Sequence, residues 1–478
     1  MTTATPPLDD TPATGAGPGS ALPAPPSDLP PVERRAVLPA GFAAGGATIG
    51  IKRSGRPDLA IVATVPGPSG SRPQAAAAAV FTPNAFAAAP IALSRAHLAA
   101  TAPDGGGSWG WAAGIVSTSG CANAATGAAG TADQEAIADA FAAAIGVPTT
   151  STLAMSTGVI GTRLPVDLVA SGIAAVVGTG LSSTDEGLAA AAEALRTTDS
   201  RQKTATTTVK LPGIDGGPVA VRVSGIAKGV GMIHPRMATM LAIVLTDAAI
   251  EPAILAGLLR PAAARTWDQL SVDGDTSTND TVFVLASGAA ETVTVGAGSA
   301  ATGMLGRAIE AVARDLARQQ AADGEGATTL ITAHVTGARD DADARAVARA
   351  VVSSSLVKAA VHGHDPNWGR VAGAAGNARL ADPAVLTAAG LTAEAADRRG
   401  GRAAEVAPDR LRIAIAGHLV FDGSAGGPIA FDRAAARAAM DGPECLIRLD
   451  LGLGAGRGEA FGCDLTEEYV RENAEYTT

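Results

Sequence analysis

The segment from Lys228 to Asp247 constrains the fold of this chain more than any other. Its first half holds glycines and a His-Pro pair, which favour turns, and its second half is an unbroken apolar run that is typical of a buried strand. The small residue Ala238 and the hydroxyl residue Thr239 lie where the two halves meet. We therefore expect a sharp bend that leads into a rigid strand, with one hydroxyl at the start of that strand.

This layout is typical of a chain that cleaves its own backbone before a hydroxyl residue. Cleavage between Ala238 and Thr239 would free the α-amine of Thr239, and α-amines have a pKa near ~8. Such an amine can act as the general base for the hydroxyl of its own residue near neutral pH. The segment thus predicts an N-terminal threonine nucleophile and two chains, 1–238 and 239–478.

Short apolar runs alternate with longer helical stretches along the rest of the chain. The predicted strands are 58–64, 114–119, 219–223, the run after Thr239, 282–286, 330–335, 411–416 and 446–451. The predicted helices are 131–145, 186–196, 305–321 and 341–361, the first with a capping box at Thr131 and Gln134. Because the order follows no strict strand–helix–strand period, a layered α/β (α+β) fold is favoured over a doubly wound nucleotide-binding fold.

Composition excludes several classes of protein. The net charge is −10 and no Lys/Arg cluster stands out, which argues against a nucleic-acid binder. No uninterrupted apolar stretch of about 20 residues is present, so we expect no membrane span and a cytoplasmic protein. Residues 1–36 are rich in Pro, Ala, Thr and Gly and lack a signal-peptide pattern, so they are predicted to be a disordered tail.

The spacing of cysteines and histidines argues against a metal site. The three cysteines, Cys121, Cys445 and Cys463, are far apart and form no pair with ligand spacing. His362 and His364 are two residues apart, but no further ligands follow at typical distances. We expect no metal and no tightly bound cofactor.

Three short segments are candidates for a catalytic role. Thr157 and Gly158 end an apolar run, where a hydroxyl and a backbone N–H can form an oxyanion hole, or simply a strand-end turn. Lys228 could bind a carboxylate, although most lysines are only solvated. Glu325 stands between two glycines, as a binder of an ammonium group or as an ordinary loop acid.

The segment 273–280 is dense in side-chain oxygen atoms. It fails as a calcium loop because Thr278 replaces the glycine of the sharp turn and Val284 replaces the bidentate glutamate. We predict a turn in which hydroxyls and carboxylates bind local backbone groups, and which could border a site.

Taken together, the motifs resemble one enzyme family, the ornithine acetyltransferases (glutamate N-acetyltransferases) of arginine biosynthesis. The resemblance covers about residues 38–478 and rests on motifs in the same order: 156–161 (STGVIG), 232–241 (MIHPRMATML), 272–280 (VDGDTSTND), 323–328 (DGEGAT), 365–370 (DPNWGR) and the ending 462–478.

The resemblance implies a sandwich fold of the N-terminal-nucleophile type, cleaved after Ala238 into α (37–238) and β (239–478) chains that stay together, typically as α2β2. It implies that Thr239 carries acetyl from N-acetylornithine to glutamate in a ping-pong cycle, with Thr157 and Gly158 as the oxyanion hole. The residues that it assigns to substrate binding are Thr198, Lys228, Thr239, Glu325, Asn473 and Thr478. It leaves open whether acetyl-CoA also serves as a donor.

Other functions remain open at this point. An N-terminal-nucleophile amidohydrolase or aminopeptidase would pass the acyl group to water, and a paralogue would act on another N-acetyl amino acid. A non-catalytic relative would not be cleaved. The chain also departs from the usual family pattern at Cys121, Arg236 and Thr329, and the last two could alter substrate preference.

Overall fold

The computed structural model describes residues 22, 28–234 and 240–474. These residues form two compact units, which we describe separately. The sandwich unit comprises residues 28–263 and 275–316, and the C-terminal unit comprises mainly 264–274 and 317–474.

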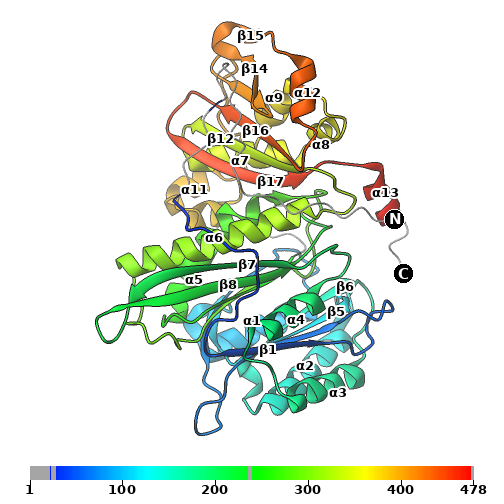
Figure 1. Cartoon of the computed structure of the whole chain (residues 1–478), viewed down its shortest axis with the longest axis vertical. Helices are drawn as coiled ribbons and strands as arrows, with labels where there is room; N and C mark the ends of the chain where they lie inside the picture. Colours follow the sequence, from blue (N-terminus) through cyan, green and yellow to red (C-terminus); the bar gives the residue numbers. More distant parts are fainter. Residues whose placement is uncertain (1–21, 23–27, 235–239, 475–478) are drawn as a thin grey trace. The chain divides into compact units, whose positions relative to one another are not determined.

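Two β-sheets form the centre of the sandwich unit (Figure 1). The four-stranded sheet has the order β1 (Phe42–Ala47), β2 (Leu59–Thr64), β5 (Gly114–Cys121) and β6 (Thr152–Val159). The six-stranded sheet has the order β4 (Trp109–Ala112), β3 (Ala75–Phe81), β11 (Thr281–Ala286), β9 (Leu241–Thr246), β8 (Pro218–Lys228) and β7 (Lys203–Pro212). Within them, β5 with β6 and β9 with β11 are parallel, and the other pairs are antiparallel.

The main core of this unit joins apolar side chains from both sheets. Val62 and Leu153 of one sheet belong to the same buried cluster as Ile243 and Phe283 of the other. Helices α1 (Ala89–Thr101) and α4 (Asp185–Leu195) contribute to that cluster. Fully buried β9 and β11 consist almost entirely of apolar residues, rich in Val, Leu and Ile, which explains why both read as strands in the sequence.

Helices cover the sheets. The other face of the four-stranded sheet packs against α2 (Gly127–Ile145) and α3 (Val166–Thr179). On the six-stranded sheet, Gly225 of β8 lies directly beneath Val312 and Leu316 of α6 (Ala300–Ala322), and α6 also contacts α5 (Pro252–Arg265). This arrangement confirms the predicted layered α/β sandwich.

The C-terminal unit contains a seven-stranded mixed sheet. Its order is β10 (Leu270–Ser271), β17 (Gly456–Cys463), β12 (Leu330–Ala338), β16 (Glu444–Asp450), β13 (Arg412–Ile415), β14 (His418–Asp422) and β15 (Gly427–Pro428). The helices are α7 (Asp341–Ser353), α8 (Ser355–His362), α9 (Trp368–Gly376), α10 (Pro383–Ala388), α11 (Ala393–Arg399), α12 (Arg433–Ala439) and α13 (Glu467–Ala474). Buried residues of α7, α8 and α9 pack with β12, β13 and β16 in one core.

Two predicted helix boundaries are wrong. Helix α2 starts at Gly127, so Thr131 lies inside it and donates to the Gly127 carbonyl instead of forming a capping box. The predicted helix 341–361 is two helices, because Ser354 adopts an extended conformation and its side chain caps α8 at the Val357 N–H.

The predicted tail boundary falls inside ordered structure. Glu33 pairs with Thr206 of β7 through two backbone hydrogen bonds of 2.8 Å, and Arg34 forms an ion pair with Asp315 of α6. The sandwich unit therefore includes residues before position 37.

Candidate active site

The structure describes six of the nine residues that the sequence assigns to cleavage, catalysis or substrate binding. Thr157, Gly158, Thr198 and Lys228 belong to the sandwich unit, and Glu325 and Asn473 belong to the C-terminal unit. Ala238, Thr239 and Thr478 lie outside the described residues.

The end of β6 has a geometry that only glycine permits. Gly158 has φ of +130°, and a Cβ there would lie 2.3 Å from the carbonyl carbon of Gly120 on the neighbouring strand β5. The β5–β6 register shifts at this point, between Gly120 and Cys121. The irregular strand end turns backbone groups away from the regular ladder, as an oxyanion hole requires.

Lys228 contacts the predicted oxyanion residue directly. Both Lys228 and Thr157 are 4% exposed, and the Lys228 Nζ donates a hydrogen bond of 3.3 Å to the Thr157 Oγ1. Because the Thr157 oxygen accepts from a cation, its own O–H is polarised and becomes a stronger donor to a third group. A hydroxyl backed by a buried ammonium group suits the stabilisation of a developing oxyanion.

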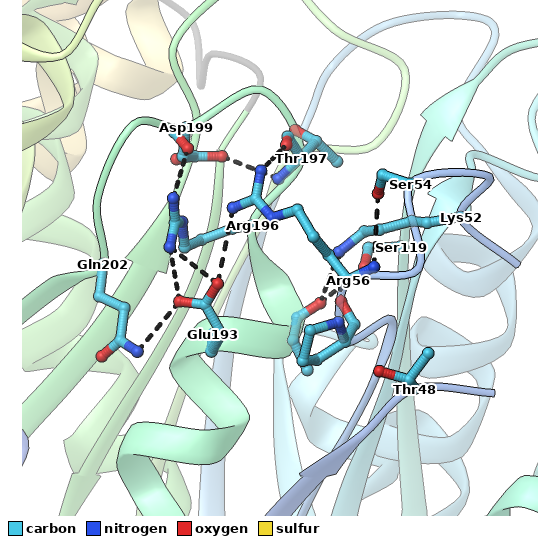
Figure 2. A network of polar contacts seen from close by, with 12 residues as sticks. Thr48, Lys52, Ser54, Arg56, Ser119, Glu193, Arg196, Thr197, Asp199 and Gln202 are labelled. Carbon is cyan, nitrogen blue, oxygen red and sulfur yellow. Dashed lines mark hydrogen bonds and ion pairs between the residues drawn. The ribbon is translucent and has the colours of Figure 1, made fainter. Parts of the chain in front are cut away.

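A buried aspartate fixes the chain on both sides of this pair. Asp199 forms a fully buried ion pair of 2.6 Å with Lys203 and accepts the N–H group of Gly229. It also accepts the N–H group of Thr197 (Figure 2). Burial raises the pKa of Asp199, but Lys203 and Lys228 outweigh it and hold the pKa far below its usual range. Asp199 therefore stays ionised and ties the end of β8 to the loop that carries exposed Thr198.

Glu325 and Asn473 are 148 residues apart in sequence, but the structure brings them together. The Asn473 Nδ2 on α13 donates a 3.0 Å hydrogen bond to the Glu325 Oε2. A Cβ on Gly326 would lie 2.4 Å from the Tyr469 backbone nitrogen, so this glycine allows the loop to approach α13. Close packing against α13 therefore explains this glycine.

The excess of negative charge beside Glu325 is visible in a neighbouring residue. Burial raises the pKa of Glu472, and the carboxylates of Glu325 and Glu468 raise it further. An ammonium group bound at Glu325 would relieve this repulsion.

Sequence reasoning missed the two most informative side chains of the segment 273–280. Buried Asn279 donates to the Ser156 carbonyl at 2.8 Å and to the Ala122 carbonyl at 2.7 Å, so it holds β6 one residue before Thr157. Asp280 accepts the Met240 N–H at 3.0 Å, one residue after Thr239. The segment was predicted to bind local backbone, but these contacts span about 40 to 157 residues.

Asp280 is fully buried, and its Oδ2 has no hydrogen-bond partner among the described residues. Burial raises the pKa of Asp280 well above its usual range, against weaker opposing effects of the Met240 N–H and Lys228. Burial therefore favours the neutral form of the Asp280 carboxyl group.

The departures from the family pattern have ordinary environments where the structure describes them. Cys121 is buried, with its Sγ 3.2 Å from the Thr162 carbonyl oxygen. The Thr329 N–H donates to Asp464 at 2.9 Å. Arg236 lies outside the described residues.

The described part of the chain contains neither a metal-binding cluster nor a membrane-spanning helix. There, no group of three or more His, Cys, Asp or Glu side chains is placed to hold a metal ion. No helix of that part combines the length and apolar character needed to cross a membrane.

The layered α/β sandwich, the glycine-specific strand end and the cation-backed hydroxyl form an arrangement that suits an enzyme acting on acyl groups. Comparison with known proteins identifies it further. Residues 43–478 match the model of the ArgJ family, and the chain belongs to that family.

Individual relatives agree with this assignment. The arginine biosynthesis bifunctional protein ArgJ of Synechococcus sp. is 42% identical over 440 residues, which cover 92% of this chain and 96% of the relative. A solved structure of ArgJ from Bacillus halodurans is 38% identical over 48% of this chain and 95% of its own, with a TM-score of 0.41. The ornithine acetyltransferase of Mycobacterium tuberculosis, solved with ornithine, is 35% identical over 43% of this chain and 97% of its own, with a TM-score of 0.36. The chain is an acetyltransferase of arginine biosynthesis.

Proposed function

We propose that the enzyme uses Thr239 to move an acetyl group from N2-acetyl-L-ornithine to L-glutamate. The observation that carries this proposal is the hydrogen bond from Lys228 to Thr157 beside the irregular strand end at Gly158. It provides a polarised donor for a tetrahedral intermediate, in a chain whose relatives are named for arginine biosynthesis.

In the first half-reaction, the Thr239 Oγ attacks the acetyl carbonyl carbon and the α-amine of Thr239 takes the hydroxyl proton. The oxyanion is stabilised by the Thr157 O–H and the Gly158 N–H. The C–N bond then breaks, and the ornithine nitrogen receives the proton as it leaves. The product is ornithine, and the enzyme retains an acetyl ester on Thr239.

In the second half-reaction, the neutral amino group of glutamate attacks the same acetyl carbon. The C–O bond to Thr239 breaks, and the proton from the glutamate nitrogen returns to the Thr239 oxygen. N-acetyl-L-glutamate leaves. Both steps pass through one oxyanion hole, so one arrangement of donors serves both substrates.

Zwitterionic substrates explain the remaining residues. Lys228 is a buried cation suited to a carboxylate, and Glu325 with Asn473 is suited to an ammonium group. We assign Thr198 and the carboxy-terminal Thr478 to substrate binding as well.

The nucleophile arises by self-cleavage in this proposal. The Thr239 Oγ attacks the Ala238 carbonyl carbon, the peptide C–N bond breaks, and water hydrolyses the resulting ester. The α (37–238) and β (239–478) chains remain associated as α2β2 in the cytoplasm. Acetyl-CoA can replace acetylornithine as donor in a bifunctional enzyme, because the acetyl-Thr239 intermediate is the same for both.

Incubation of the purified protein with acetylornithine and glutamate tests the function. We expect stoichiometric ornithine and N-acetylglutamate, and a mass increase of one acetyl group on the 239–478 chain when glutamate is omitted. Acetate without N-acetylglutamate would show an amidohydrolase instead. A parallel assay with acetyl-CoA in place of acetylornithine tests whether acetyl-CoA is a second donor.

A further inference from the structure

The two substrates of the proposed ping-pong cycle differ in charge at their side-chain ends. N-acetylornithine carries a δ-ammonium group, whereas glutamate carries a γ-carboxylate. In the proposed function, Glu325 suits the δ-ammonium group, and Lys228 binds the α-carboxylate that both substrates share. A second cation would suit the γ-carboxylate, and this inference rests on the proposed function.

The segment after β1 carries two cations, Lys52 and Arg56, and hydrogen bonds to Asp58 fix its backbone. The buried carboxylate of Asp58 accepts four successive backbone N–H groups, those of residues 49 to 52, at 2.6 to 3.1 Å. This fixes the loop from Ile49 to Lys52 independently of its exposed tip at Arg53 and Ser54. The backbone of Lys52, from which its side chain extends, is therefore fixed in position.

Lys52 lies next to the oxyanion strand end. A Cβ on Gly120 would meet the Lys52 Cγ at 3.2 Å, and Gly120 is the residue that Gly158 contacts. The Lys52 stem, Gly120 and Gly158 are therefore successive neighbours. The Lys52 Nζ binds the carbonyl oxygens of Pro57 and Ala194.

Arg56 is a second cation near Lys52, and it lies close to the predicted substrate residue Thr198. Its guanidinium donates to the Thr197 carbonyl at 3.2 Å, directly before Thr198, and lies 3.5 Å from Glu193 (Figure 2). Glu193 is itself shared with Arg196. Lys52, in contrast, has no carboxylate within ion-pair distance among the described residues.

The electrostatic surroundings of Lys52 favour the binding of an anion. Burial, Arg56 and Lys228 lower the pKa of Lys52 from 10.5 to about 8, whereas Asp58 and Asp199 raise it only partly. A bound carboxylate would supply the missing negative charge.

We propose that Lys52, supported by Arg56, binds the γ-carboxylate of glutamate and so selects the acceptor of the second half-reaction. It is a specificity-determining residue, and the first half-reaction does not use it.

Half-reaction kinetics of Lys52→Gln test this proposal. We expect kcat/KM for glutamate to fall about 10- to 100-fold, the effect of losing one charged hydrogen bond, while kcat/KM for acetylornithine changes little. The neutral isostere glutamine, offered to the acetyl-enzyme, should react equally with both proteins. Lys210→Gln, on the exposed end of β7, is the matched control and should match the wild type.

The pH dependence provides a second readout. The ratio of wild-type to Lys52→Arg kcat/KM for glutamate should be constant below pH ~8 and decline above it, because lysine loses its proton there and arginine does not. The ratio cancels the titration of glutamate itself and of the nucleophile.

Three outcomes would overturn the inference. In Lys52→Gln, an equal fall for glutamate and glutamine would show that Lys52 does not act through the γ-carboxylate. A fall for acetylornithine as large as that for glutamate would indicate binding of the shared carboxylate. Unchanged kinetics would remove Lys52 from recognition altogether. A wild-type protein without any acetyl transfer would contradict the proposed function instead.

Discussion

Thr239 carries out two successive reactions in the proposed mechanism, and one substitution tests both. Thr239→Ala removes the only oxygen that can attack Ala238 or the acetyl group. We expect a single chain of 46.9 kDa on a denaturing gel and no acetyl transfer. Thr239→Ser, which keeps the hydroxyl, should still be cleaved. A cleaved or active Thr239→Ala protein would contradict the assignment.

Asp280 links pH to stability at the residue scale. Its pKa is raised by burial, so between the unfolded pKa near ~4 and the raised pKa only the folded protein holds the proton. The free energy of unfolding therefore falls as pH rises through that window, by about 1.4 kcal/mol per pH unit.

Asp280→Asn removes this titration while its amide oxygen can still accept the Met240 N–H. Urea unfolding at a series of pH values above ~4 should show the variant gaining stability relative to the wild type as the pH rises through the window. If the free energy of unfolding changes with pH equally in the two proteins, Asp280 is ionised in the folded wild type.

The sequence could select candidate site residues where they lie in local motifs. Thr157, Gly158, Lys228 and Glu325 each belong to a short recognisable segment. Asn279 and Asp280 could not be assigned in this way, because their partners at Ser156 and Met240 are distant in sequence. A buried side chain that bonds distant backbone leaves no periodic signal along the chain.

At the scale of elements, the β5–β6 strand end depends on the absence of a side chain. Gly158→Ala combines a disfavoured φ with a 2.3 Å approach to Gly120, so we expect a loss of about 2–4 kcal/mol and of most activity. Gly146→Ala is the control, because Gly146 also has positive φ, +72°, but no atom lies within 4 Å of its Cβ position.

The control should lose only about 1 kcal/mol and keep its activity. Thermal unfolding and initial rates of both variants measure the difference. Equal losses would mean that backbone strain alone, rather than contact with Gly120, limits the substitution.

Apolar strands were predictable, but capped helix junctions were not. The runs that form β9 and β11 stand out because both faces of these strands are buried. The break between α7 and α8 was missed because Ser354 stands in a continuous helical pattern, in which a single extended capping residue leaves no periodic signal. The same limit applies to the start of α2.

At the scale of the molecule, the predicted cleavage site lies between strands that are paired. In the six-stranded sheet, β9 and β11 follow the site in sequence, whereas β8 on one side and β3 on the other precede it. The later chain is thus hydrogen-bonded on both sides to the earlier chain.

We therefore expect the two chains to elute together from a size-exclusion column after cleavage, and to separate only in denaturant. Native mass spectrometry provides the same readout. Dissociation of the 239–478 chain under native conditions would contradict the observed strand order. Uncleaved Thr239→Ala is the reference for the elution volume.

With the proposed cleavage, the interleaved sheet would make maturation a one-way process. An intact precursor would fold as a single chain, so insertion of β9 and β11 between β3 and β8 would be an intramolecular step with no dependence on concentration. After cleavage, the same insertion would require two separate molecules to meet, one of them with a sheet that lacks its middle strands. The cleaved enzyme would then persist because it unfolds slowly, since the unfolded chains could not readily reassemble.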